Sequence, residues 1–185
     1  PEAVRTIIGF GQPMDQHPLM LHDFALEMVW APMLRTLADG LDVELDGITT
    51  HVERRPLERT IDVPGMGIFD EGTLGAFRFE VRGIVDGRPL LVVEHITRID
   101  DDCAPDWPIA PLGQGVHRVR ITGHPDLTVD VHGVEPGEPG AAGGGNATAA
   151  NRIVNAVPAV CAAMPGIVGP LDLPAITGAR QLRHG

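Results

Sequence analysis

Residues 75–108 read GAFRFEVRGIVDGRPLLVVEHITRIDDDCAPDWP, and this stretch decides the fold. Apolar and charged residues alternate over 77–82, as they do in a strand with one buried face. Asp86 and Gly87 then form a residue pair that favours the tight turn of a β-hairpin. The returning strand, at 90–99, is apolar on both sides in its first half. This pattern predicts a central strand that is covered on both faces.

Polar residues gather where this second strand ends, and they are Glu94, His95, Thr97 and Arg98. Because neighbours along a strand alternate, His95 and Thr97 share one face, and only one face can line a pocket. His95 is the one side chain there that titrates near neutral pH.

The loop at 104–108 follows directly, and its prolines make it rigid while it presents Asp106 and Trp107. We therefore expect the strand end and this loop to form one wall of a ligand pocket. The alternative is a half-buried polar strand end whose groups are satisfied by their neighbours.

The composition limits the class of protein. The chain has 185 residues, is 43% hydrophobic and carries a net charge of −11, which indicates one domain, 1–185, with a real core. No basic stripe is present, so nucleic acid and anionic membranes are not expected as partners. No apolar run approaches the ~20 residues that cross a bilayer. With no opening signal segment, we expect a cytoplasmic protein.

Three residue types are absent from the whole sequence, namely Lys, Ser and Tyr. This excludes a serine nucleophile, a lysine Schiff base and a P-loop lysine within the chain. The first residue is Pro1 rather than Met, so the sequence could be a piece of a longer protein.

The remaining chain predicts helices at both ends of a strand meander. Residues 18–37 have helical spacing and are apolar over most of their surface, which predicts a deeply packed helix with a kink or break at Pro32. Strands follow at 42–54 and 57–63, and a second hairpin pairs 116–122 with 127–132. Residues 135–145 are predicted to be a flexible linker, and 147–164 a helix with one buried stripe. The fold class is α+β, a mostly antiparallel sheet with helices packed on one face.

Other candidate sites are less specific. A metal could bind among His17, His22, Asp23 and Glu27, or among three histidines of the second hairpin, but neither set has a recognised ligand spacing. The glycine run 143–145 could hold an anion or could be a linker. Asn151 and Asn155 lie on one helical face and could line a cleft or bond to the sheet edge.

Several short motifs together resemble one family. They are Phe79-Glu80-Val81 with Gly83, Glu94-His95-Ile96-Thr97-Arg98, Ala104-Pro105-Asp106-Trp107-Pro108, Thr148-Ala149, Val154-Asn155-Ala156-Val157-Pro158, Pro165-Gly166, Asp172-Leu173-Pro174 and Thr177-Gly178. From residue 12 onward the chain resembles the C-terminal domain of the NAD(P)H-dependent amine dehydrogenases, a family that includes 2,4-diaminopentanoate dehydrogenase and is related in architecture to dihydrodipicolinate reductase.

The resemblance implies a two-domain homodimeric enzyme whose N-terminal Rossmann domain binds NAD(P) and whose C-terminal domain closes the pocket for an amine or ketone. This chain has no strand–Gly-x-Gly-x-x-Gly–helix unit, so we expect the cofactor domain to be missing and the chain alone to be inactive and to bind no cofactor. The substrate-binding residues that the resemblance and the pocket together suggest are His95, Thr97, Asp106, Trp107 and Asn155. A stand-alone binding or scaffolding domain is the main alternative, and a small hydrolase using His95 and Asp106 is a weaker one.

Overall fold

The structure is a computed structural model that describes residues 7–111, 115–133 and 141–177. The chain divides into two compact units, Pro1–Pro108 and Ile109–Gly185, and each is described by itself below. Compact units of this kind do not define independently folding domains, so one domain over the whole chain stays a prediction. Within the described ranges, no helix is long and apolar enough to cross a membrane.

The first unit is built on a three-stranded antiparallel sheet in the order β1-β4-β5. Its strands are β1 (Gly47–Pro56), β4 (Leu74–Val85) and β5 (Arg88–Arg98). The predicted hairpin is confirmed as the β4–β5 pair. Asp86 and Gly87 both have positive φ angles, 51° and 69°, which is what a two-residue turn matched to the strand twist requires. A short antiparallel pair, β2 (Ile61–Val63) with β3 (Gly67–Phe69), precedes β4.

The central strand of this sheet is β4, and the prediction that the returning strand is central is wrong. Strand β4 pairs with β1 on one side and β5 on the other, and its Phe77, Phe79 and Val81 are fully buried. Strand β5 lies at the edge, where Leu90 and Val92 remain about half exposed, at 53% and 50%. An apolar run fits either position, and only the pairing decides between them.

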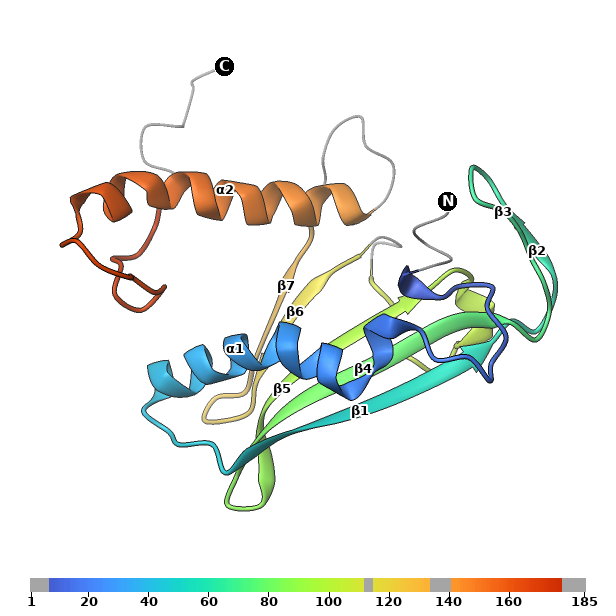
Figure 1. The fold of residues 1–185 in the computed structure, drawn as a ribbon, viewed down its shortest axis with the longest axis horizontal. Coiled ribbons are helices and arrows are strands. Elements are labelled where there is room, and N and C mark those ends of the chain that lie inside the picture. The colour runs from blue at the N-terminus through green and yellow to red at the C-terminus, as the bar shows by residue number, and fades with distance from the viewer. Residues whose placement is uncertain (1–6, 112–114, 134–140, 178–185) are drawn as a thin grey trace. The chain divides into compact units, whose positions relative to one another are not determined.

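Helix α1 (Asp23–Leu41) follows a 3-10 turn at Leu19–Leu21 and covers one face of the sheet, as Figure 1 shows. Its buried residues are Leu26, Ala31, Leu34 and Ala38. The helix passes through Pro32 without a break and ends at Leu41, where Asp42 adopts the left-handed conformation. Deep packing was expected, but the outer face is exposed. One layer of sheet covers only one stripe of a helix.

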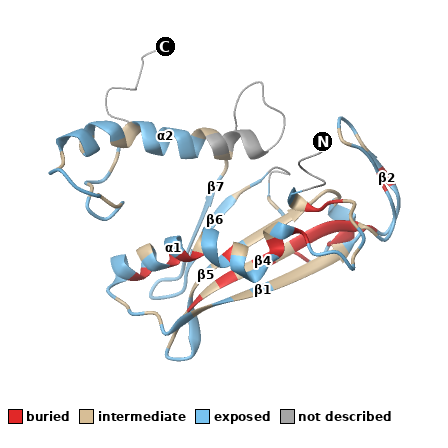
Figure 2. Cartoon of the chain, viewed as in Figure 1, coloured by how far each residue is buried: buried red, intermediate tan, exposed pale blue. Residues whose placement is uncertain are grey.

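Helix α1 and the face of the sheet that it covers contribute much of the core of the first unit. Figure 2 shows buried residues concentrated along β4, with smaller groups on α1 and in the loops. Ring contacts link Phe79 to Phe77 and to Trp30, with centroids 6.4 and 5.9 Å apart. Trp30 packs at the margin of the core, where it is partly buried. The sheet therefore has one face under α1 and a second, charged face.

The second unit contains an antiparallel hairpin, β6 (His117–Ile121) with β7 (Leu127–Val131), and helix α2 (Ala141–Ala162). The hairpin prediction is confirmed. The linker prediction is wrong for residues 141–145, which are helical, and the earlier part of the predicted linker, 135–140, lies outside the described residues. The stripe of α2 expected to be buried is exposed, since none of the described residues of this unit is fully buried. The architecture is thus α+β, with antiparallel strands in three small sheets rather than in one.

Candidate functional site

His95 and Thr97 share one face of the sheet, as alternation predicted, and in the structure this is the face that α1 covers. In the ladder they stand opposite Phe79 and Phe77 of β4, whose rings are buried under the helix. The His95 imidazole is nearly parallel to the Phe79 ring, with centroids 5.1 Å apart, and lies 6.0 Å from Phe77. Burial lowers the pKa of His95 below its usual range. The ring is therefore held neutral near pH 7 against an aromatic surface.

Glu94 lies on the opposite face, within a network of charged groups. Its carboxylate is 2.7 Å from Arg78 Nε, and Glu80 binds both Arg78 and Arg82 at 2.8 and 2.6 Å. Burial alone would raise the pKa of Glu80, but the hydrogen bonds and charges of the two guanidinium groups lower it overall. Burial likewise opposes the charge of Arg78, whose pKa its carboxylate neighbours nevertheless raise. On this face of the sheet, the arginine and glutamate side chains therefore neutralise one another.

Arg98 fastens the loop that carries Trp107. The Arg98 side chain is only 10% exposed, and its guanidinium donates to the carbonyl oxygen of Ala104 at 2.7 Å and to that of Pro108, while its Nε lies 3.4 Å from Asp101. Planar, multiply donating arginine suits this bridging of two carbonyls. The loop is therefore fixed to the end of β5 by Arg98, a contact that its prolines did not indicate.

Trp107 is almost completely buried, with 4% of its surface exposed, and it belongs to the core of the first unit. The Arg55 guanidinium lies 5.3 Å from its ring centroid and 3.4 Å from the Asp106 carboxylate. Arg55 also pairs with Glu53, which contacts Arg78 in the charged network. Trp107 therefore contacts the charged face of the sheet, opposite to the face of His95.

The predicted site residues thus separate into groups. His95 and Thr97 are together on the helix side, while Asp106 and Trp107 are together beside Arg55. The Asp106 side chain is 64% exposed, so of Asp106 and Trp107 it is Asp106 that can reach a ligand. Asn155 lies on α2 in the second unit. Its role stays a prediction.

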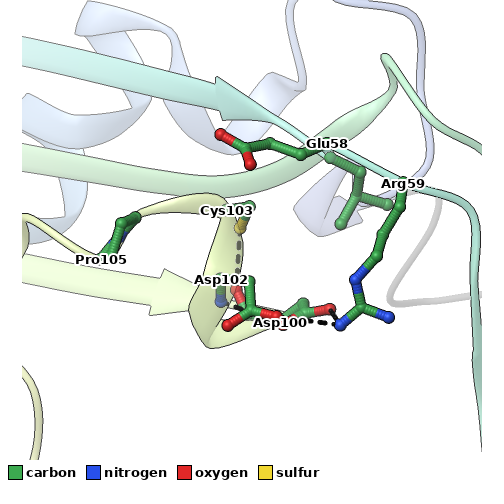
Figure 3. A pocket seen from close by; sticks show the side chains of 7 residues that line it. Glu58, Arg59, Asp100, Asp102, Cys103 and Pro105 are labelled. Carbon is green, nitrogen blue, oxygen red and sulfur yellow. Dashed lines mark hydrogen bonds and ion pairs between the residues drawn. The ribbon is translucent and has the colours of Figure 1, made fainter.

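A pocket that the sequence did not indicate lies beside the same loop, and Figure 3 shows it from close by. It has a volume of about 390 Å³ and is lined by Leu57, Glu58, Arg59, Asp100, Asp102, Cys103 and Pro105. Arg59 pairs with Asp100 and Asp102 at 3.0 Å each. Three carboxylates against one guanidinium leave the lining negative, which suits a small cationic group such as an ammonium.

The Cys103 thiol in this pocket donates to the carbonyl oxygen of Asp100 at 2.8 Å, and burial raises its pKa. It is therefore a packed thiol and not a thiolate nucleophile. The run Asp100-Asp101-Asp102 is not recognisable as part of a pocket from the sequence alone. The missing signal was Arg59, which is far away in sequence and reaches the run only because the strands pair.

A metal centre finds no support in the part of the chain that the structure describes, where no three His, Cys, Asp or Glu side chains are grouped to hold an ion. The glycine pair Gly9 and Gly11 does not have the surroundings of a dinucleotide-binding motif. Gly9 and Gly11 have positive φ angles, and a Cβ on Gly9 would lie 2.2 Å from Pro18. They form a packed turn and not the phosphate cradle of a Gly-x-Gly-x-x-Gly motif.

Comparison with known proteins gives the chain its family context. Over 175 residues, 94% of its length, it is 47% identical to an amine dehydrogenase of Streptomyces virginiae. The chain is homologous to part of an amine dehydrogenase. It spans about half, 48%, of the length of that amine dehydrogenase. No family model matches the sequence.

The fold agrees with this homology. The structure of an amine dehydrogenase from Mycobacterium smegmatis matches 96% of the chain with a TM-score of 0.58, at 18% sequence identity, and the match covers 47% of that protein. Similarity at this identity supports a shared fold only. The relationship to amine dehydrogenases that the motifs suggested is thereby confirmed.

Proposed function

We propose that this chain is the substrate-binding and dimerisation part of an NAD(P)-dependent oxidoreductase that interconverts amines and ketones in the cytoplasm. The observation that carries the proposal is the 47% identity to an amine dehydrogenase over nearly the whole chain. The fold is proposed to be that of the C-terminal domain of dihydrodipicolinate reductase. The hydride chemistry is assigned to a cofactor-binding part of the protein other than the residues described, so this chain alone is expected to be inactive and to bind no cofactor.

The residues of this chain would bind and orient the substrate. His95 stays neutral because burial lowers its pKa, and so it offers a hydrogen bond without a competing positive charge that would repel an ammonium group. Thr97, on the same face, adds a hydroxyl group. Asp106, which lies toward the opposite face of the sheet, presents a carboxylate from a loop that Arg98 holds in place, and it is proposed as a separate contact to the substrate. Positioning of this kind accelerates a reaction by removing orientational freedom before the chemical step.

Trp107 and Asn155 are two further proposed substrate-binding residues, one in each unit of the chain. Because Trp107 is buried, its contribution would be to support Asp106 from below rather than to offer an open aromatic surface. Asn155 would contribute from α2. Both assignments rest on the resemblance of the motifs that contain these residues to those of amine dehydrogenases.

The experiment is steady-state kinetics of an enzyme that contains this chain joined to a nicotinamide-binding half. Thr97→Val and Asp106→Asn remove polar contacts without removing packing, and we expect each to raise KM or lower kcat for several amines by about tenfold. Arg35→Gln, an exposed residue of α1, is the control. Unchanged kinetics in both variants would rule out this pocket wall. Absence of turnover with every amine would favour the binding or scaffolding alternative.

Dimerisation is proposed for the second unit because its apolar residues are uncovered. Hairpin β6–β7 carries five exposed aliphatic residues on one face, at Val119, Ile121, Leu127, Val129 and Val131. Isolated two-stranded hairpins are marginally stable in water, so such a surface needs a partner. Sedimentation of the chain should give a dimer, and Val129→Asp should shift it to monomer. A monomeric parent chain would contradict the proposal.

A further inference from the structure

A second cavity lies on the α1 side of the first unit, between the start of the helix and strand β1. It has a volume of about 310 Å³ and is lined by His17, Leu21, His22, Asp23, Val52 and Arg54. None of these residues belongs to the proposed pocket wall. The cavity therefore needs an account of its own.

Arg54 is the fixed positive charge of this cavity. Its Nη1 donates to the carbonyl oxygen of Gln16 at 2.6 Å, which fixes the guanidinium while leaving its other nitrogens available. Its neighbour Arg55 pairs with Glu53 and Asp106, and Arg78 and Arg82 on β4 also have carboxylate partners. Among the described residues, no carboxylate lies within ion-pairing distance of Arg54. An anion from solution can take that place.

Two imidazoles lie in the same cavity. The rings of His17 and His22 have centroids 6.4 Å apart and are tilted by 57°. Each ring can donate one N–H when neutral and two when protonated, so the pair adds directional donors to the guanidinium. Arginine and histidine together favour an oxygen anion over a cation.

Asp23 limits the charge of the ligand. One of its carboxylate oxygens accepts a hydrogen bond from the Thr50 hydroxyl, which holds the acid towards β1. A second negative charge on the ligand would be repelled by this carboxylate. Leu21 is buried and Val52 half-buried, so the remaining wall is aliphatic. The lining is thus complementary to one anionic group attached to a short apolar chain.

We propose that this cavity binds a small aliphatic carboxylate, with Arg54 and the two histidines on the carboxylate group and Leu21 and Val52 against the hydrocarbon chain. One water occupies about 30 Å³ of liquid, and the cavity volume of about 310 Å³ is roughly ten times larger. The cavity can therefore accommodate a small aliphatic carboxylate. This site does not depend on the proposed oxidoreductase function, because no residue of the pocket wall takes part in it.

The test is titration of the 185-residue chain with isobutyrate, followed by the NMR signals of the His17 and His22 imidazoles. We expect saturable shifts with a Kd on the order of 1 mM. Arg54→Gln should weaken binding about tenfold or more, because the charged hydrogen bonds are lost. Asp23→Asn should strengthen it a few-fold, because a repulsion is removed. Arg35→Gln, on an exposed turn of α1, should leave the affinity unchanged.

Each other outcome overturns the proposal. Valine binding more tightly than isobutyrate, together with weaker binding in Asp23→Asn, would show that the site takes a zwitterion. Inorganic phosphate binding as well as isobutyrate would show attraction by charge without the aliphatic contact. Equal affinity of Arg54→Gln and the parent chain would remove the guanidinium from the site. Absence of histidine shifts at saturating isobutyrate would mean that the cavity binds no carboxylate.

Discussion

Strand β4 in the first unit and hairpin β6–β7 in the second have the same kind of alternating sequence, but only β4 is buried. In β4 the apolar positions Phe77, Phe79 and Val81 are covered by α1 and flanked by strands on both sides. In the hairpin the equivalent positions, Val119 and Val129 among them, stay about half exposed. Alternation therefore determines which residues share a face. It does not determine whether another layer covers that face.

The two units also differ in how their charges are paired. On the charged face of the first unit, Arg78 bridges Glu53, Glu80 and Glu94, which come from three different strands. In the hairpin, Arg118 pairs with Asp130 directly across the two strands at 2.6 Å. The first arrangement links side chains of all three strands of the sheet. The second supports one pair of strands, as an exposed ion pair can do only weakly.

The largest difference in the free energy of unfolding is expected between an alanine substitution of an aromatic core residue and one of an aliphatic residue in the hairpin. Phe79→Ala should lower the free energy of unfolding by about 3–5 kcal/mol, because it leaves a cavity among Trp30, Phe77 and His95. At high dilution, where the chain is monomeric and the hairpin face is exposed, Val129→Ala should change the free energy of unfolding by less than about 1 kcal/mol. Urea denaturation measures both values. A large loss in Val129→Ala that depends on protein concentration would show that a second copy covers the hairpin.

Glycines give a finer comparison of packing in the two units. A Cβ on Gly75 would lie 2.7 Å from Leu57 Cδ2, and Leu57 is itself buried, so Gly75→Ala should destabilise the protein by about 1–3 kcal/mol. A Cβ on Gly123 would meet only the carbonyl oxygen of Pro125 at 3.8 Å. The free energy of unfolding of Gly123→Ala should therefore stay within about 0.5 kcal/mol of that of the parent protein. Equal thermal midpoints for the two variants would contradict tight packing at β4.

The smallest expected effect is a pH dependence in the first unit. The unfolded chain has a His95 pKa near 6.5, and burial lowers the folded value, so the unfolded state binds more protons as the pH falls below about 6.5. Stability should thus be fully present above that pH and decrease below it. Urea midpoints at pH 7.5 and 5.5 should differ less in His95→Gln than in the parent. His124→Gln, in the exposed hairpin turn, is the control, and an equal effect there would exclude His95 as the cause.

The local pattern predicted the elements of the candidate site well and their association poorly. The turn at Asp86-Gly87 and the shared face of His95 and Thr97 both follow from neighbours in sequence. The pocket at Cys103 did not, because Arg59 joins it across about forty residues of chain. The burial of Trp107 was also missed, since proline-rich loops are usually read as surface.

By itself, the sequence determined the hairpins, both helices, the α+β class and the relationship to amine dehydrogenases, because these depend on residue spacing and on motifs that are read along the chain. Only the tertiary structure decided that β4 rather than β5 is central, that α1 buries one stripe, and that Arg98 and Arg55 hold the Trp107 loop. The physical reason is that burial and charge pairing depend on which segments meet in space. These contacts join residues that are far apart in sequence, and a local periodic pattern contains no information about such contacts.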